Sequence, residues 1–219
     1  VRVTKIKFCG LTGLDDARSA VDAGAWAIGL IFWPDSPRRC GLAEAAEIGA
    51  ALRRRVEVAG VFFNASLDHV ARTADEVGLT MLQLHGEEGP VYCAEAARRT
   101  GCKVIKAARV RGRADIQALA AFRTDYHLLD SYVSGQPGGT GQTFAWEMAA
   151  AHRRVGRDPV PVILSGGLTP ENVAQGITAV RPFAVDVASG VELEPGRKDP
   201  DKLVAFADAV RSVAAAGVA

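Results

Sequence analysis

The stretch Leu164-Ser165-Gly166-Gly167-Leu168-Thr169-Pro170-Glu171-Asn172 carries three signals that decide the fold. It begins at the end of an apolar strand, passes through two glycines that permit a tight turn, and ends at the start of a helix. Thr169 offers a hydroxyl cap, Pro170 suits the first helical position, and Glu171 places a carboxylate in the first turn. The stretch is therefore the middle of a strand–loop–helix unit.

The same unit recurs along the chain. Apolar, β-rich runs begin near residues 4, 27, 57, 81, 103, 126, 160 and 184, and segments with helical periodicity lie between them, at 15–23, 43–53, 66–76, 90–100 and 203–215. Eight such units predict an α/β fold, a TIM (β/α)8 barrel that spans residues 1–219 as a single domain. A doubly wound open sheet is the alternative, although it usually has about five or six strands.

Composition argues against several classes of function. The chain has 219 residues, 48% of them hydrophobic, and a formal net charge of +1, which predicts a globular domain with a large core. The balanced charge argues against binding to nucleic acid or a membrane surface. No apolar run approaches the roughly 20 residues of a membrane span, and the first ten residues resemble a strand and not a signal peptide.

Cysteine usage and glycine spacing bear on compartment and cofactors. Cys9, Cys40, Cys93 and Cys102 match no metal-binding spacing, so they predict a reduced, cytoplasmic protein without a metal site. No dinucleotide-binding fingerprint follows the first strand. The run Gly135-Gln136-Pro137-Gly138-Gly139-Thr140-Gly141 lacks the spacing of a P-loop, and it predicts a mobile loop after the sixth strand. We therefore expect no cofactor.

Two glycine-rich loops predict a phosphate site. Gly166 and Gly167 let the backbone approach an anion, and the helix start after them presents N–H groups. Ser189 and Gly190 offer the same resources in Val185-Asp186-Val187-Ala188-Ser189-Gly190-Val191. Either segment alone would be an ordinary turn. Together they occupy the two units in which this fold binds phosphate, the seventh and the eighth.

Two ionisable side chains end predicted strands, where active sites of such barrels lie. Cys9 follows Thr4-Lys5-Ile6-Lys7-Phe8, and it is either a small core residue or a thiolate base whose pKa nearby positive charge would lower. Asp130 follows Tyr126-His127-Leu128-Leu129, where a carboxylate needs a partner or solvent, which favours a role in the active site. A thiol and a carboxyl group at strand ends suit proton transfer on a small substrate, and together with the two phosphate loops they predict an acid–base isomerase acting on a sugar phosphate.

Three further residues are candidate substrate ligands. Asp186 interrupts an apolar run, and it is either a hydrogen-bond acceptor for a substrate hydroxyl or a buried structural acceptor. Arg38, in the loop after the second strand, is either a solvated charge or a bidentate clamp for a carboxylate. His85 ends the fourth strand and either orients the substrate or is a hydrogen-bonded structural histidine.

At these residues the chain resembles the phosphoribosylanthranilate isomerases of tryptophan biosynthesis. The resemblance covers nearly the whole chain and rests on the ordered combination of its segments. These are Lys7-Phe8-Cys9-Gly10-Leu11-Thr12, Gly60-Val61-Phe62-Phe63-Asn64, Gln83-Leu84-His85-Gly86, Leu128-Leu129-Asp130, Gly138-Gly139-Thr140-Gly141-Gln142-Thr143-Phe144, Leu164-Ser165-Gly166-Gly167 and Val185-Asp186-Val187-Ala188-Ser189-Gly190-Val191-Glu192.

The resemblance implies a cofactor-independent Amadori rearrangement of N-(5-phosphoribosyl)anthranilate to 1-(2-carboxyphenylamino)-1-deoxyribulose 5-phosphate. It implies that Cys9 is the general base, which removes the proton from C2 of the ribose. It also implies that Asp130 is the general acid, which protonates the ring oxygen so that the furanose opens. Arg38 matches the family's ligand for the anthranilate carboxylate. The expected partner is therefore a small-molecule substrate, with neither nucleic acid nor membrane, and the protein is a monomer or a homodimer.

Two positions depart from the family pattern. Ala145 stands in Thr143-Phe144-Ala145-Trp146 where the family usually has Asp. This loss puts anchoring of the loop after the sixth strand in question more than the chemistry. Phe8 replaces a smaller aliphatic residue before the cysteine, which asks only for local repacking.

Alternatives to this function remain. The related histidine-pathway isomerase performs the same chemistry on a substrate with two phosphates. The first half of this chain has no counterpart of Ser165-Gly166-Gly167, and a Cys/Asp pair replaces the paired aspartates of that family, which also disfavours a dual-specificity barrel. A non-catalytic sugar-phosphate-binding barrel would keep the phosphate loops but would not need both Cys9 and Asp130.

Overall fold

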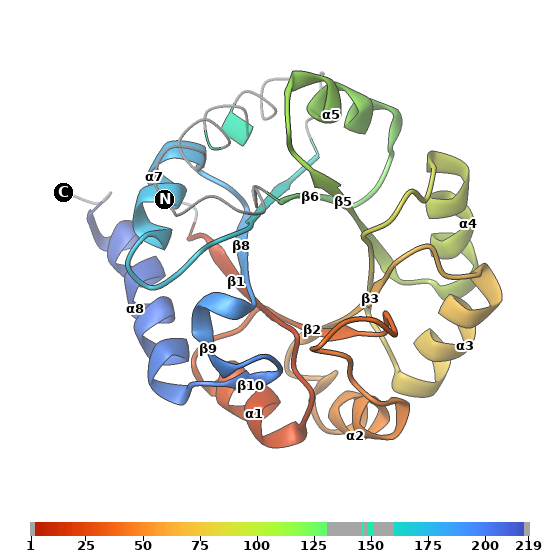
Figure 1. Ribbon diagram of the computed structural model, residues 1–219, viewed down its shortest axis with the longest axis horizontal. Helices are drawn as coiled ribbons and strands as arrows, with labels where there is room; N and C mark the ends of the chain where they lie inside the picture. The colour runs from red at the N-terminus through yellow and green to blue at the C-terminus, as the bar shows by residue number, and fades with distance from the viewer. Residues whose placement is uncertain (1–2, 131–145, 147–148, 151–159, 217–219) are drawn as a thin grey trace.

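Eight parallel strands form a closed barrel in the computed structural model of the chain, and helices surround it (Figure 1). The structure describes residues 3–130, 146, 149–150 and 160–216. The strands are β1 (Lys5–Cys9), β2 (Ala27–Ile31), β3 (Glu57–Phe62), β4 (Met81–Leu84), β5 (Lys103–Arg109), β6 (Tyr126–Asp130), β7 (Val162–Ser165) and β8 (Ala184–Val187). Each strand pairs with the next, and β8 pairs with β1. The predicted TIM barrel is confirmed, and the open-sheet alternative is wrong because the closed order leaves no edge strand.

The helices lie close to the positions that periodicity predicts. They are α1 (Leu14–Asp22), α2 (Leu42–Leu52), α3 (Leu67–Val77), α4 (Pro90–Thr100), α5 (Arg113–Ala118), α7 (Val173–Val180) and α8 (Pro200–Ala216), with 3-10 turns η1 (Leu119–Ala121) and η2 (Ser189–Val191). A short hairpin of β9 (Glu192–Glu194) and β10 (Arg197–Lys198) follows η2 and was not predicted. The expected mobile loop at 135–141 and the departure at Ala145 lie outside the described residues. Within the described part, no helix is long and apolar enough to cross a bilayer.

Capping chemistry places the start of α8 where the sequence predicts it. Asp199 Oδ1 accepts hydrogen bonds from the N–H groups of Asp201 (3.0 Å) and Lys202 (3.3 Å). Pro200 is the first helical residue. A side-chain acceptor followed by proline therefore begins this helix as expected.

Helix α7 begins about one turn later than predicted. The helix begins at Val173 with Asn172 as its N-cap, and not at Thr169. Asn172 Oδ1 accepts from the Thr169 N–H (2.8 Å), and Asn172 Nδ2 donates to the Gly167 carbonyl (2.9 Å). These two bonds hold a turn over residues 169–172, and the Thr169 carbonyl accepts from the N–H groups of Asn172 (3.3 Å) and Val173 (3.0 Å), so the turn leads directly into the helix.

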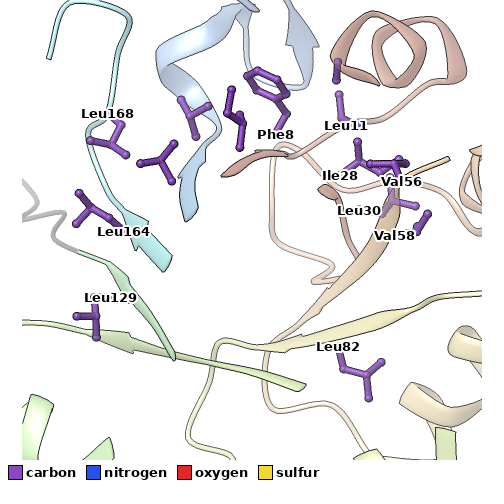
Figure 2. Packing of buried hydrophobic residues seen from close by; sticks show 14 of the residues in the cluster. Phe8, Leu11, Ile28, Leu30, Val56, Val58, Leu82, Leu129, Leu164 and Leu168 are labelled. Atoms are coloured by element: carbon purple, nitrogen blue, oxygen red, sulfur yellow. The ribbon is translucent and has the colours of Figure 1, made fainter. Parts of the chain in front are cut away.

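Strand side chains alternate between the barrel interior and the surrounding helices. An interior cluster contains Ala27, Ala59, Met81, Ile105, Ala107, Leu128, Ile163 and Ala184. Figure 2 shows the outward set, which includes Phe8, Ile28, Leu30, Val58, Leu82, Leu129 and Leu164. Because strand side chains alternate, Lys7 and Cys9 point inward when Phe8 points outward. The Phe8 ring packs edge-on against Phe206 of α8, with centroids 5.9 Å apart, which accommodates the larger residue at this position.

Aromatic side chains gather at the amino-terminal end of the barrel. The Trp26 ring lies 5.5 Å from Tyr126 and 5.2 Å from Phe183, measured between centroids. Lys5 Nζ lies 5.3 Å from the Trp26 ring and 5.2 Å from the Phe183 ring, so its charge is shared with two aromatic faces. The ionisable candidates of the sequence analysis lie at the opposite, carboxyl end of the strands, where TIM barrels carry their active sites.

Gly49 sets the close contact between α2 and α3 and generates a test of this packing. A Cβ atom at Gly49 would lie 1.8 Å from the carbonyl oxygen of Val77. Gly49→Ala should lower the free energy of unfolding by about 1–3 kcal/mol through overpacking, although alanine favours a helix over glycine by up to about 1 kcal/mol. Urea unfolding measures the change. Glu47→Ala, an exposed site on the same helix, is the control and should stay within about 0.5 kcal/mol. Equal stability of Gly49→Ala and wild type would contradict the packing.

Candidate active site

Cys9 ends β1 beside an unoccupied Cβ position on β2. Gly29 is the register partner of Cys9, and a Cβ atom there would lie 2.6 Å from Cys9 Sγ and 3.0 Å from Lys7 Nζ. The thiol and the ammonium therefore border the same small volume, which only glycine leaves open. Cys9 is buried, with 5% of its surface exposed.

Lys7 and Asp186 form a buried ion pair across the strands that close the barrel. Lys7 Nζ lies 2.7 Å from Asp186 Oδ1, and the Lys7 side chain has no exposed surface. Ser165 Oγ donates to Asp186 Oδ2 at 3.1 Å. Burial alone would lower the pKa of Lys7, but the attractions of Asp186 and Cys9 outweigh it, so that pKa is raised. Both carboxylate oxygens of Asp186 thus accept hydrogen bonds from protein side chains, which is what a buried structural acceptor would do.

The electrostatics of Cys9 differ from the simple expectation of a lowered pKa. Burial raises the pKa of the thiol, and the positive charge of Lys7 opposes that rise. Asp186 adds to the rise, while Lys198 acts against it. The predicted positive charge is therefore present near Cys9, but desolvation of the thiolate outweighs its effect, and the pKa of Cys9 is raised. The lowered pKa that the interpretation as a thiolate base called for is not present, because burial of the thiol outweighs the neighbouring positive charge.

His85 and Asp130 approach each other from strands on either side of β5. His85 Nε2 lies 3.6 Å from Asp130 Oδ2, and His85 Nδ1 lies 3.2 Å from Gln83 Nε2. His85 and Asp130 are separate candidates in the sequence, and in the structure their side chains are neighbours. An imidazole beside a carboxyl group can hold it in place and exchange a proton with it.

Arg38 is not a solvated loop charge. Its Nε lies 2.9 and 3.0 Å from the two carboxylate oxygens of Glu192, and its Nη2 lies 2.8 Å from Oε2. Lys198 Nζ donates to the same carboxylate at 2.8 Å. Burial would raise the pKa of Glu192, but hydrogen bonds from these two cations lower it. The guanidinium of Arg38 therefore already binds a carboxylate of the protein itself, that of Glu192, and this contact fixes its direction.

Arg38 also borders the strand end that carries Cys9. A Cβ atom at Gly10, the residue after Cys9, would lie 2.8 Å from Arg38 Cδ. Gly10 has a φ of +76°, in the left-handed region that favours glycine. Gly10 is therefore favoured for two reasons, its left-handed backbone and its close contact with Arg38. The aliphatic part of the Arg38 side chain packs against the turn that follows Cys9.

The loops after β7 and β8 touch each other. A Cβ atom at Gly190 would lie 1.9 Å from the carbonyl oxygen of Leu168, so the two backbones are in contact. Gly166 and Gly167 have φ values of +93° and +63°, which favour glycine. Ser189 begins η2 and is exposed. The two predicted halves of a phosphate site thus lie side by side, and Thr169 lies at their contact, with its Cα 3.2 Å from the Cβ position of Gly190.

Metal ligands are not gathered in the part of the chain that the structure describes. There, no group of three or more His, Cys, Asp and Glu side chains could hold a metal ion.

Fold and site together define a class of protein. A (β/α)8 barrel with a buried thiol, a carboxyl–imidazole pair and two touching glycine loops at its carboxyl end is laid out as an acid–base enzyme. The family model for N-(5'phosphoribosyl)anthranilate (PRA) isomerase matches residues 6–209. The chain belongs to the N-(5'-phosphoribosyl)anthranilate isomerase family, as its sequence resemblance predicted.

Individual relatives agree with this assignment. The N-(5'-phosphoribosyl)anthranilate isomerase of Citrifermentans bemidjiense is 51% identical over 92% of this chain and 94% of its own length. A structure of monomers generated from the dimeric phosphoribosylanthranilate isomerase of Thermotoga maritima has a TM-score of 0.83 and 36% identity, over 95% of this chain and 99% of that one. A phosphoribosyl anthranilate isomerase in complex with reduced 1-(o-carboxyphenylamino)-1-deoxyribulose 5-phosphate has a TM-score of 0.84 and 37% identity, with the same coverage.

Sequence reasoning missed three residues around the candidate site. Lys7 lies beside the thiol, Gly29 provides the space that both share, and Glu192 holds Arg38. The spacing of Lys7 and Cys9 was a usable signal, since residues two apart on a strand point to the same side. Gly29 and Glu192 left no comparable signal, because their roles depend on contacts with other parts of the chain.

The contact at Gly190 generates a test of the anion site. Gly190→Ala should push the β8 loop away from Leu168 and weaken binding of inorganic phosphate at least tenfold, while circular dichroism stays unchanged. Isothermal titration with phosphate measures the affinity. Gly112→Ala is the matched control, because a Cβ atom there meets nothing within 4 Å. Unchanged phosphate affinity in Gly190→Ala would remove the anion site from these loops.

Proposed function

We propose that this chain catalyses the Amadori rearrangement of N-(5'-phosphoribosyl)anthranilate to 1-(2-carboxyphenylamino)-1-deoxyribulose 5-phosphate in tryptophan biosynthesis. The observation that carries the proposal is the arrangement at the carboxyl end of the barrel. Cys9 lies on one side with Lys7, and Asp130 lies on another side with His85. Family membership and the bound product analogue of a similar structure support the choice of substrate.

Two proton transfers make up the chemistry. Asp130 acts as the general acid, protonating the ring oxygen so that the bond between it and C1 breaks and the furanose opens. Cys9 acts as the general base and removes the proton from C2. Ring opening leaves a C1=N iminium to the anthranilate nitrogen, so the electron pair of the C2–H bond forms a C1=C2 double bond and the iminium π pair returns to nitrogen, which gives an enolamine. The C2 hydroxyl then loses its proton while C1 gains one, and C2 becomes the ketone carbon. The conversion is redox-neutral overall, so the proposal requires no cofactor.

The remaining candidates bind the substrate in this proposal. Gly166, Gly167, Ser189 and Gly190 hold the phosphate with backbone N–H groups and a hydroxyl. Arg38 binds the anthranilate carboxylate, in an orientation that Glu192 fixes. His85 contacts the ribose part, and so does Asp186, whose carboxylate oxygens can each accept a further hydrogen bond beside those from Lys7 and Ser165. His85 lies beside Asp130 and also steadies the general acid.

The acid–base assignment predicts the effect of removing either group. Cys9→Ala and Asp130→Asn should each lower kcat by about 10²–10⁴-fold, which is what a positioned acid or base contributes. Both variants should still bind a product analogue within a few-fold of wild type. Cys93→Ala, another buried cysteine, is the control and should keep kcat. Near-normal turnover of Cys9→Ala or Asp130→Asn would end the corresponding assignment.

The proposed contact between Arg38 and the anthranilate carboxylate predicts an effect on KM more than on kcat. Arg38→Met should raise KM at least tenfold with a smaller loss in kcat, because a charge-assisted contact contributes about 1.5–3 kcal/mol. Arg39→Met is the control, since this neighbouring arginine is exposed, and it should leave KM unchanged. Equal KM values for Arg38→Met and wild type would assign Arg38 to the Glu192 contact alone.

The alternatives are separable by substrate. Turnover of the histidine-pathway substrate would add dual specificity, and phosphate binding without turnover of either substrate would support a non-catalytic barrel.

We further infer one domain over residues 1–219, a monomer or homodimer, and action in the cytoplasm. The four cysteines are free thiols, as a reducing compartment requires. Light scattering and a single unfolding transition test the assembly and the domain.

A further inference from the structure

Lys7 is the only fully buried cation of β1, and the acid–base proposal does not use it. Its ammonium lies 2.7 Å from Asp186 and shares with Cys9 the volume above Gly29. A buried ammonium is costly, and a single carboxylate is enough to neutralise it. The second neighbour of this ammonium is the side chain proposed as the base.

The proposed base needs help to ionise. Burial opposes the thiolate, so the Cys9 pKa is raised although Lys7 acts in the other direction. The charged groups that act on Cys9 come from three strands. They are Lys7 from β1, Asp186 from β8 and Lys198 from β10. Lys7 is the cation best placed to stabilise the thiolate, because its ammonium borders the same volume at Gly29 as the sulfur, whereas Lys198 is held by Glu192 at 2.8 Å.

We propose that Lys7 is a positioning residue for Cys9, with an ammonium that divides its charge between the Asp186 carboxylate and the thiol and so decides how readily the thiol ionises. When Cys9 loses its proton, the ammonium already faces the sulfur and no group must move in. Asp186 acts against Cys9 by repulsion, but it keeps Lys7 charged and in place. The inference deepens the proposed function and rests on the role of Cys9 as the base.

Opposite substitutions should move the ionisation in opposite directions. Lys7→Met removes the cation at similar length, so the acidic limb of the kcat/KM profile should move up by about 1–3 pH units, the usual effect of an opposite charge at this range. Asp186→Asn removes the repelling negative charge, while its amide oxygen can still accept from the Lys7 ammonium and hold it beside the thiol, so the limb should move to lower pH. A residue that merely supported the fold would lower the rate without moving the limb.

A second readout does not depend on turnover. Labelling of the Cys9 peptide by iodoacetamide, followed by mass spectrometry across pH, reports the thiolate directly. Its midpoint should shift up in Lys7→Met and down in Asp186→Asn. If Lys7→Met does not fold, Lys7→Met/Asp186→Asn removes both charges at once and should still shift the midpoint up, because the thiolate loses the ammonium that borders it at Gly29.

A matched buried pair elsewhere provides the control. Lys106 Nζ lies 3.0 Å from Glu88 Oε2, and both residues are buried. Lys106→Met/Glu88→Gln should leave the labelling midpoint of Cys9 unchanged. An unshifted midpoint in Lys7→Met, or an equal shift in the control, overturns the inference. If the midpoint shifts as expected but wild type does not convert the substrate, the proposed function fails and the control of the thiol by Lys7 stands.

Discussion

The ion pair between Lys7 and Asp186 is the interaction on which the candidate site depends. It joins β1 to β8, the two strands whose pairing closes the barrel. A buried ammonium is tolerated inside the barrel because a carboxylate neutralises it, and the same ammonium lies beside the thiol of Cys9. Ser165 extends the contact to β7. The contacts of Lys7 with Asp186 therefore join the strands that close the barrel and also place a positive charge beside the thiol.

Glycines determine how closely the other parts of the site approach one another. Gly29 leaves room for a thiol and an ammonium, Gly10 lets the chain turn against Arg38, and Gly190 lets one loop touch the next. In each case a methyl group would meet another atom at less than 3 Å. The polar groups of the site can converge because these positions carry no side chain.

Much of the architecture could be predicted from the sequence, because eight strands and their helices leave a strong periodic signal. The candidate residues could also be predicted in part, since polar side chains at the ends of apolar strands are conspicuous. The exact start of α7 could not, because residues 169–172 form a turn, held by the Asn172 side chain, before the regular helix begins at Val173. The pairing of Arg38 with Glu192 could not either, since it joins residues far apart in the chain. The raised pKa of Cys9 depends on burial, which a strand-end position does not reveal.

Fluorescence of the anthranilate group provides the most direct test of the central claim, that this barrel converts its substrate by acid–base chemistry alone. The purified chain, freed of metals and small molecules, is added in catalytic amounts to N-(5'-phosphoribosyl)anthranilate. The account predicts complete decay of the substrate fluorescence over many turnovers, with 1-(2-carboxyphenylamino)-1-deoxyribulose 5-phosphate as the product. Decay no faster than in buffer, from a folded chain that still binds phosphate, would contradict it.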